Sequence, residues 1–212
     1  SYSIEVTGGD GCIVHINQQN PQIQYGSYVY NQYRRSTNGG ASWTSVNLSG
    51  SQGLFVNPFD YDDAQNIMYC SNGSAAMRRW DNANTTNTSI VLTLSNVTGN
   101  LTSLKYSPFT NNRVYFGTSG GRLYRLDNAN TATSPTAASV DISGASFPAG
   151  TIICVNTGTN DNNLVATYSN YGVNNVWVST TGGSSWTAVD GDLPDMPVRW
   201  AMFEPGDNSK LF

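Results

Sequence analysis

The chain has 212 residues, enough for one sizeable all-β domain with its own core. Charged residues make up 11% of it, compared with about 25% in an average soluble protein, and the net charge is −4 with lysines at Lys105 and Lys210 alone. These features exclude a nucleic-acid partner, which needs clustered Lys and Arg, and no apolar run is long enough to predict a membrane-spanning helix.

Asn, Ser, Thr, Gly and Tyr take the place of charged residues, which we interpret as the composition of an extracellular or cell-surface protein. The first residues, SYSIEVTGG, lack the basic start and apolar run of a secretion signal, so we expect such a signal to have been removed or never included. Cys12, Cys70 and Cys154 each lie in an apolar, strand-like run. We predict buried free thiols, with a single disulfide as the alternative.

Taken in chain order, the strand-like runs fall into groups of four, and no run has a helical period. The first group contains the runs GCIVHIN, QIQYGSYVY, YRRS and SWTSVNL. Later groups repeat this order, with second strands such as IMYCS, RVYFGTS and LVATYS. The first strands are expected to end at Val56-Asn57-Pro58, Tyr106-Ser107-Pro108 and Phe203-Glu204-Pro205, because proline suits the end of a strand. Val155-Asn156-Thr157 is expected to end the remaining first strand, with Thr in place of Pro.

The sequence STNGGASW at 36–43 recurs as STTGGSSW at 179–186, a spacing of 143 residues or three periods of about 48. Repeats of this length indicate the blades of a β-propeller. We therefore expect an all-β propeller segment with four complete four-stranded antiparallel blades. Their predicted bounds are 12–47, 53–95, 101–143 and 151–190, with partial blades at 1–11 and 196–212.

The last run, KLF, stops inside an expected strand, and a closed propeller has typically four to eight blades. We therefore expect the chain to be part of a longer protein with at least six blades, and the remaining blades to be its partners.

The pattern Ser/Thr-x-Asx-x-Gly-x-x-Trp resembles the Asp-box, or BNR repeat, of sialidase-type, sortilin-like and xyloglucanase-like propellers. Asn38 and Thr181 stand where the family has Asp. The residues themselves predict a hairpin turn in which side-chain oxygens accept turn N–H groups and the Trp covers the turn. The resemblance implies a structural role at the blade periphery for Ser36, Asn38, Gly40, Trp43, Ser179, Thr181, Gly183 and Trp186.

The leads GGDG at 8–11 and DLPDMPV at 192–198 also resemble segments that precede blades in xyloglucanase-type and sortilin-like propellers. A xyloglucanase-like hydrolase would need two carboxylates across a cleft, and that family carries them in Asp-x-Gly-Gly loops, which are absent here. The nearest candidates are Asp10 with Asp192 or Asp195 as distant partners. Alternatively, Asp10 caps a glycine-rich turn. The Arg-Ile-Pro signature of sialidases is also absent.

The segment DYDD carries Asp60, Asp62 and Asp63, which could hold a calcium ion with hard oxygen ligands. The alternative is an ordinary turn between the first and second strands, without any cofactor. His15 is expected to face a neighbouring blade from a strand.

Four aromatic residues are candidates for stacking on a ligand, with packing inside or between blades as the alternative. These residues are Tyr168, Tyr171, Trp177 and Trp200.

We therefore expect a non-catalytic binding or scaffold module of a large secreted bacterial or cell-surface protein. Its ligand would be a protein or a glycan at the propeller face. The first alternative is part of a xyloglucanase-like glycoside hydrolase whose acids lie partly outside this segment. The second is a sortilin-like or assembly-factor propeller that grips a protein partner in its central tunnel.

Overall fold

The structure is a computed structural model that describes residues 9–48, 51–134 and 137–212. These residues form strands and turns, without a helix in the described ranges. Most of the expected partial blade at 1–11 lies outside them.

Four sheets follow one another along the chain, and we call them blades 1 to 4. Blade 1 consists of β1 (Val14–Ile16), β2 (Gln24–Ser27), β3 (Gln32–Ser36) and β4 (Thr44–Asn47). Blade 2 consists of β5 (Phe59–Asp62), β6 (Ile67–Ser71), β7 (Ala76–Trp80) and β8 (Ile90–Ser95). Blade 3 consists of β9 (Leu101–Tyr106), β10 (Val114–Thr118), β11 (Leu123–Leu126) and β13 (Val140–Asp141). Blade 4 consists of β14 (Ile152–Thr157), β15 (Leu164–Tyr168), β16 (Val176–Ser179) and β17 (Thr187–Ala188).

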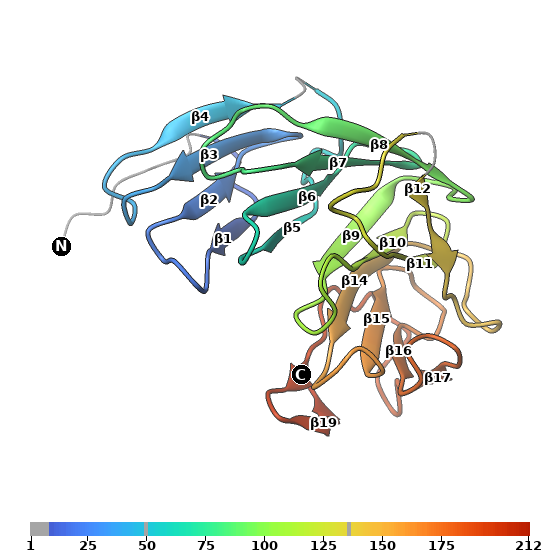
Figure 1. The fold of residues 1–212 in the computed structure, drawn as a ribbon. Coiled ribbons are helices and arrows are strands. Elements are labelled where there is room, and N and C mark those ends of the chain that lie inside the picture. Colours follow the sequence, from blue (N-terminus) through green and yellow to red (C-terminus); the bar gives the residue numbers. More distant parts are fainter. Residues whose placement is uncertain (1–8, 49–50, 135–136) are drawn as a thin grey trace.

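Each blade is antiparallel throughout, and β18 (Phe203–Glu204) pairs with β19 (Asp207–Leu211) as a fifth, two-stranded sheet. Figure 1 shows the blades along an arc, with β1, β5, β9 and β14 on its inner side. The prediction of four four-stranded antiparallel blades is confirmed. The first strand of every blade therefore faces the axis of the arc.

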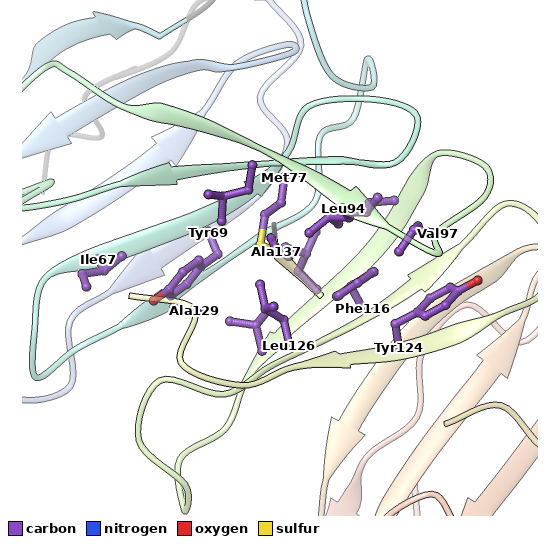
Figure 2. Packing of buried hydrophobic residues seen from close by; sticks show 14 residues of the cluster. Ile67, Tyr69, Met77, Leu94, Val97, Phe116, Tyr124, Leu126, Ala129 and Ala137 are labelled. Carbon is purple, nitrogen blue, oxygen red and sulfur yellow. The ribbon is translucent and has the colours of Figure 1, made fainter. Parts of the chain in front are cut away.

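The core lies between the blades rather than within any one of them. The central strands β6, β10 and β15 are buried at every residue, because neighbouring blades cover both of their faces. Between blades 2 and 3, Tyr69, Met77, Leu92, Leu101 and Phe116 are fully buried in one cluster, part of which is drawn in Figure 2. Burial of each such side chain contributes roughly 1.5–3 kcal/mol.

Two arginines, the half-buried Arg35 and the buried Arg79, tie successive blades together. Arg35 on β3 donates through Nη1 to the carbonyl oxygens of Ala83 and Thr86, at 2.8 and 2.6 Å, in the turn that follows β7. Arg79 on β7 repeats this one blade later, with Ala129 and Ala132 as acceptors at 2.9 Å each. The third strand of one blade is thereby fixed to the connection that follows the third strand of the next.

A short strand, β12 (Ala137–Ala138), links blades 2 and 3 in a second way. The chain leaves blade 3 after β11, pairs in parallel with the outer strand β8 of blade 2, and then returns to blade 3 as β13. This crossover covers part of the outer edge of blade 2, which would otherwise present unpaired backbone groups.

The expected end of the first strand in blade 2 is wrong. Val56-Asn57-Pro58 precede β5 instead of ending it. The strand ends at Asp62, whose Oδ1 accepts two backbone N–H groups of the following turn at 3.0 and 3.1 Å. In blade 3 the Oγ of Ser107 does the same at 3.1 and 2.9 Å. Asp62 in blade 2 is therefore the counterpart of Ser107 in blade 3. Aligning Pro58 with Pro108 in the sequence sets the two blades out of register.

All three cysteines are free thiols, and Cys70 and Cys154 are buried as predicted. Burial raises the pKa of the Cys70 thiol to about 12 and that of Cys154 to about 11. Cys12 differs from the prediction, because it is partly exposed.

Candidate binding site on the inner face

A cavity of about 520 Å³ lies where the first strands of all four blades meet. Its walls come from β1, β5, β9 and β14 and from the segment that leads into β18. The curvature of the arc creates it, because these strands belong to different sheets and are far apart in sequence.

Large apolar side chains around this cavity are exposed. Val14 on β1 is 78% exposed, Val56 before β5 is 56% exposed, and Trp200 before β18 is 64% exposed. All three line the cavity. Folding leaves these apolar side chains exposed here, whereas the faces between the blades are packed. The inner cavity is therefore the candidate binding site of the described residues.

One carboxylate lines the cavity among the described residues, and it is already fully engaged. Asp60 accepts the backbone N–H groups of Tyr61 at 2.9 Å and of Tyr106 at 2.8 Å. Its Oδ2 also lies 3.2 Å from Nζ of Lys105. Asp60 therefore joins the first strands of blades 2 and 3 and compensates the charge of Lys105.

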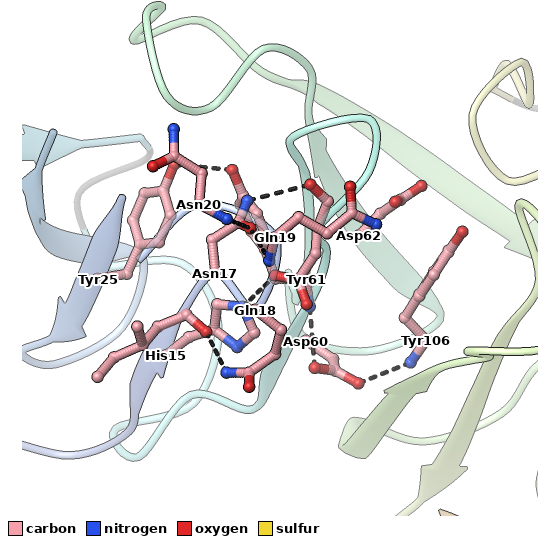
Figure 3. Close-up of polar contacts among 12 residues, drawn as sticks. His15, Asn17, Gln18, Gln19, Asn20, Tyr25, Asp60, Tyr61, Asp62 and Tyr106 are labelled. Carbon is pink, nitrogen blue, oxygen red and sulfur yellow. Dashed lines mark hydrogen bonds and ion pairs between the residues drawn. The ribbon is translucent and has the colours of Figure 1, made fainter. Parts of the chain in front are cut away.

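A second, more polar cavity of about 420 Å³ shares His15, Asp60 and Lys105 with the first. His15 Nε2 lies 2.8 Å from Oδ1 of Asp63 in the next blade, and its ring packs against Tyr61 at 5.0 Å between centroids. Figure 3 shows this set of side chains between blades 1, 2 and 3. His15 thus faces a neighbouring blade, as expected from its strand position.

Tyr61, which lines this polar cavity, and Tyr25 together join blades 1 and 2. The hydroxyls of Tyr25 and Tyr61 lie 3.1 Å apart, and that of Tyr61 donates to Oδ1 of Asn66 at 3.0 Å. Burial raises the pKa of Tyr25 to about 12 and raises that of Tyr61 further. Both phenols therefore stay neutral at physiological pH.

The three aspartates proposed for calcium do not converge on one point. Asp60 bonds to Lys105 and backbone N–H groups, Asp62 to its own turn and to Gln65, and Asp63 to His15. Asp60 and Asp62 lie on β5 rather than in a turn, which corrects the sequence interpretation. No group of three or more His, Cys, Asp or Glu side chains in the described ranges could hold a metal ion.

The carboxylates proposed for catalysis lie apart from the cavities. Asp10 is exposed at the start of blade 1, and its carbonyl accepts a weak bond from the Cys12 thiol at 3.6 Å. Asp192 and Asp195 are exposed in the loop that follows blade 4. None of the three lines the two cavities on the inner face.

The four aromatic candidates separate into buried and exposed pairs. Tyr168 is fully buried and donates its hydroxyl to the carbonyl of Gly121 at 2.8 Å. Trp177 is buried and donates Nε1 to the carbonyl of Asn174 at 2.9 Å. Neither can stack on a ligand, which corrects that prediction. Tyr171 is exposed in the turn after β15, outside both cavities, and Trp200 alone of the four lines the inner cavity.

The two copies of the repeated motif form matching turns between the third and fourth strands. Ser36 Oγ accepts the N–H of Asn38 at 3.3 Å and of Gly40 at 2.9 Å, and Ser179 Oγ accepts those of Thr181 and Gly183 at 3.1 and 2.9 Å.

The tryptophans of the motif close both turns. Trp43 Nε1 donates to the carbonyl of Gly40 at 3.0 Å, and Trp186 Nε1 donates to that of Gly183 at 3.2 Å. None of the motif residues lines the inner cavities. Every side-chain contact described for these turns is internal to the fold.

Sequence reasoning missed Val14, Val56, Lys105 and Arg199, which line the inner cavity with Trp200. They follow no motif, since valine and lysine in a strand are ordinary. The available signal was indirect: Val14 and Lys105 lie in the first strands of blades 1 and 3, and Val56 and Arg199 lie in the segments that lead into β5 and β18.

No family model matches the chain, and no curated protein matches it. Among solved structures it is similar to YCF48 from Cyanidioschyzon merolae, with a TM-score of 0.66 and 13% identity over 93% of this chain and 65% of that one. YCF48 bound to D1 peptide has a TM-score of 0.68 and 13% identity, covering 97% and 62%. The chain has a β-propeller fold.

The chain is also similar to the solved structure of the GH74 xyloglucanase from Xanthomonas campestris. The TM-score is 0.61, with 18% identity over 89% of this chain and 32% of the enzyme. The chain spans less than two thirds of the length of each of these proteins. At such identities the likeness concerns the fold. The described residues contain no helix that could cross a membrane.

Proposed function

We propose that this propeller is a non-catalytic binding module and that its inner cavity takes a segment of a partner polypeptide. One observation carries the proposal: exposed Val14, Val56 and Trp200 surround a cavity whose one described carboxylate, Asp60, already has three partners. Apolar side chains around a concave site suit insertion of an apolar side chain. Hydrolysis of a glycosidic bond needs two available carboxylates instead.

The comparisons support the proposal at the level of the fold. YCF48 has been solved with D1 peptide bound, so a protein of similar fold holds a polypeptide. We further propose, from the low charge and the abundance of Asn, Ser, Thr and Gly, that the protein acts outside the cell or at its surface. The matching turns at 36–43 and 179–186 support assigning them as Asp-boxes of the BNR type.

A xyloglucanase-like glycoside hydrolase is the second candidate. It is favoured by the similar GH74 fold and by the exposed indole of Trp200, which could stack on a sugar ring. Its catalytic acids would have to come from outside the described residues that line the cavity. Release of reducing sugar from xyloglucan by the 212-residue chain would favour this candidate over the binding module.

Selection from a display library of random twelve-residue peptides tests the binding proposal. We expect enriched peptides that bind the wild-type chain and lose about 30-fold or more in affinity for Trp200→Ser, because a central aromatic residue often carries 2 kcal/mol or more. The control is Tyr171→Ser, which removes an aromatic side chain that is also mostly exposed but lies away from the cavity. Enriched peptides that bind both variants as well as wild type would contradict the proposal.

A further inference from the structure

Arg199 stands next to Trp200 at the inner cavity with its charge uncompensated. Its side chain is exposed, and within the described part of the chain it has no hydrogen bond or ion pair. The other charged groups lining the cavity differ, because Lys105 is paired with Asp60 at 3.2 Å. The ring of His15 is hydrogen-bonded to Asp63 at 2.8 Å. Among the permanently charged side chains that line this cavity, Arg199 alone has no partner within the described part of the chain.

The backbone on both sides of Arg199 and Trp200 is fixed, although the pair lies outside any strand. Val198 N–H donates to the carbonyl of Tyr168 at 3.0 Å. The carbonyl of Ala201 accepts Nδ2 of Asn156 at 2.8 Å. Blade 4 thus holds the residue before and the residue after the pair, which lowers the ordering cost that binding would otherwise incur.

We propose that the polypeptide in this cavity presents a large apolar side chain next to a carboxylate. The apolar side chain packs against Trp200, Val14 and Val56, and the carboxylate pairs with the guanidinium of Arg199. Guanidinium and carboxylate match in planar, two-pronged geometry. This inference rests on the proposed function, because it names the motif that the same cavity recognises.

The alternative is a partner segment that presents a basic side chain instead of a carboxylate. The neighbouring polar cavity does not favour this alternative. The carboxylates of that cavity already have partners: Asp60 bonds to Lys105, Asp62 to its own turn, and Asp63 to His15. A basic ligand would have to displace these bonds, whereas a carboxylate at Arg199 displaces none. Because the whole chain has a net charge of −4, the preference is local rather than a long-range attraction.

The test compares selections from the same peptide library on wild type and on Arg199→Glu. On wild type we expect Asp and Glu to outnumber Lys and Arg beside the apolar residue of the enriched peptides, and Arg199→Glu should reverse this preference. For one enriched peptide, replacing its acidic residue by Lys should weaken binding to wild type about two- to fivefold, as for an exposed ion pair. The same replacement should strengthen binding to Arg199→Glu.

Lys210→Glu is the matched control, since it makes the same change of charge away from the inner cavity and should leave the preference unchanged. Trp200-dependent peptides with no charge preference, or with one that survives Arg199→Glu, would overturn this inference and leave the proposed function standing. A selection without Trp200-dependent peptides would overturn both.

Discussion

Asp60 joins two blades with a single carboxylate. It accepts the backbone N–H of Tyr61 on its own strand and that of Tyr106 on β9, and it pairs with Lys105. In the sequence, Asp60 belongs to an acidic run whose spacing suggests an ion site. The fold uses it differently, because the partly buried backbone N–H groups of Tyr61 and Tyr106 need an acceptor. Sequence spacing alone could not distinguish these two roles.

The buried tyrosine pair predicts that the protein loses stability at alkaline pH. A tyrosine whose pKa is raised in the folded state contributes stability that is fully present below its unfolded pKa of about 10 and lost as the pH rises through the folded value. For Tyr25 that value is about 12. The loss between pH 10 and 12 should therefore be smaller in Tyr25→Phe than in wild type, by about 1–3 kcal/mol.

Urea denaturation of both proteins at several pH values measures this difference. Tyr171→Phe, a change at an exposed position, is the control and should follow the wild-type curve. Equal losses in Tyr25→Phe and wild type would show that Tyr25 is not part of the alkaline transition.

At the scale of the elements, blade-to-blade contacts hold the structure together. The alternating strands and the 48-residue period were sufficient to predict four antiparallel blades. They were insufficient to place β5, because Pro58 and Pro108 occupy different positions in their blades while Asp62 and Ser107 are equivalent. The reason is that a turn can be capped by any side chain with a suitable oxygen, so chemically different residues end equivalent strands.

The arginine links between blades give a prediction at this scale. Arg79→Met should lower the free energy of unfolding by about 2–3 kcal/mol, because it removes a buried charged donor and leaves the carbonyls of Ala129 and Ala132 without it. Arg125→Met is the matched control on the third strand of the next blade. Arg125 pairs through Nε with the half-exposed Asp127 at 3.0 Å, so its loss should cost about 1 kcal/mol or less. Equal costs measured by urea denaturation would refute a special role for Arg79.

At the scale of the whole molecule, the inner face is a product of curvature. Val14, Val56, Lys105 and Trp200 come from four separate parts of the chain, and only the arc of blades brings them around one cavity. No local sequence pattern marks these residues. The sequence therefore predicted the propeller, but it proposed only two residues of this cavity for binding: Trp200 as a ligand contact and Asp60 as a metal ligand. The repeated motif is the clearest pattern in the sequence, yet its side chains are used within the turns they form.

Photo-crosslinking most directly tests whether the inner cavity binds a polypeptide. An enriched peptide would carry p-benzoylphenylalanine in place of its apolar residue, and mass spectrometry would locate the attachment sites after irradiation. We expect attachment around Val14, Val56, Leu104 and Trp200, which line the cavity, and loss of the crosslink in Trp200→Ser. Attachment at the turns 36–43 and 179–186, or spread evenly over the surface, would contradict the account.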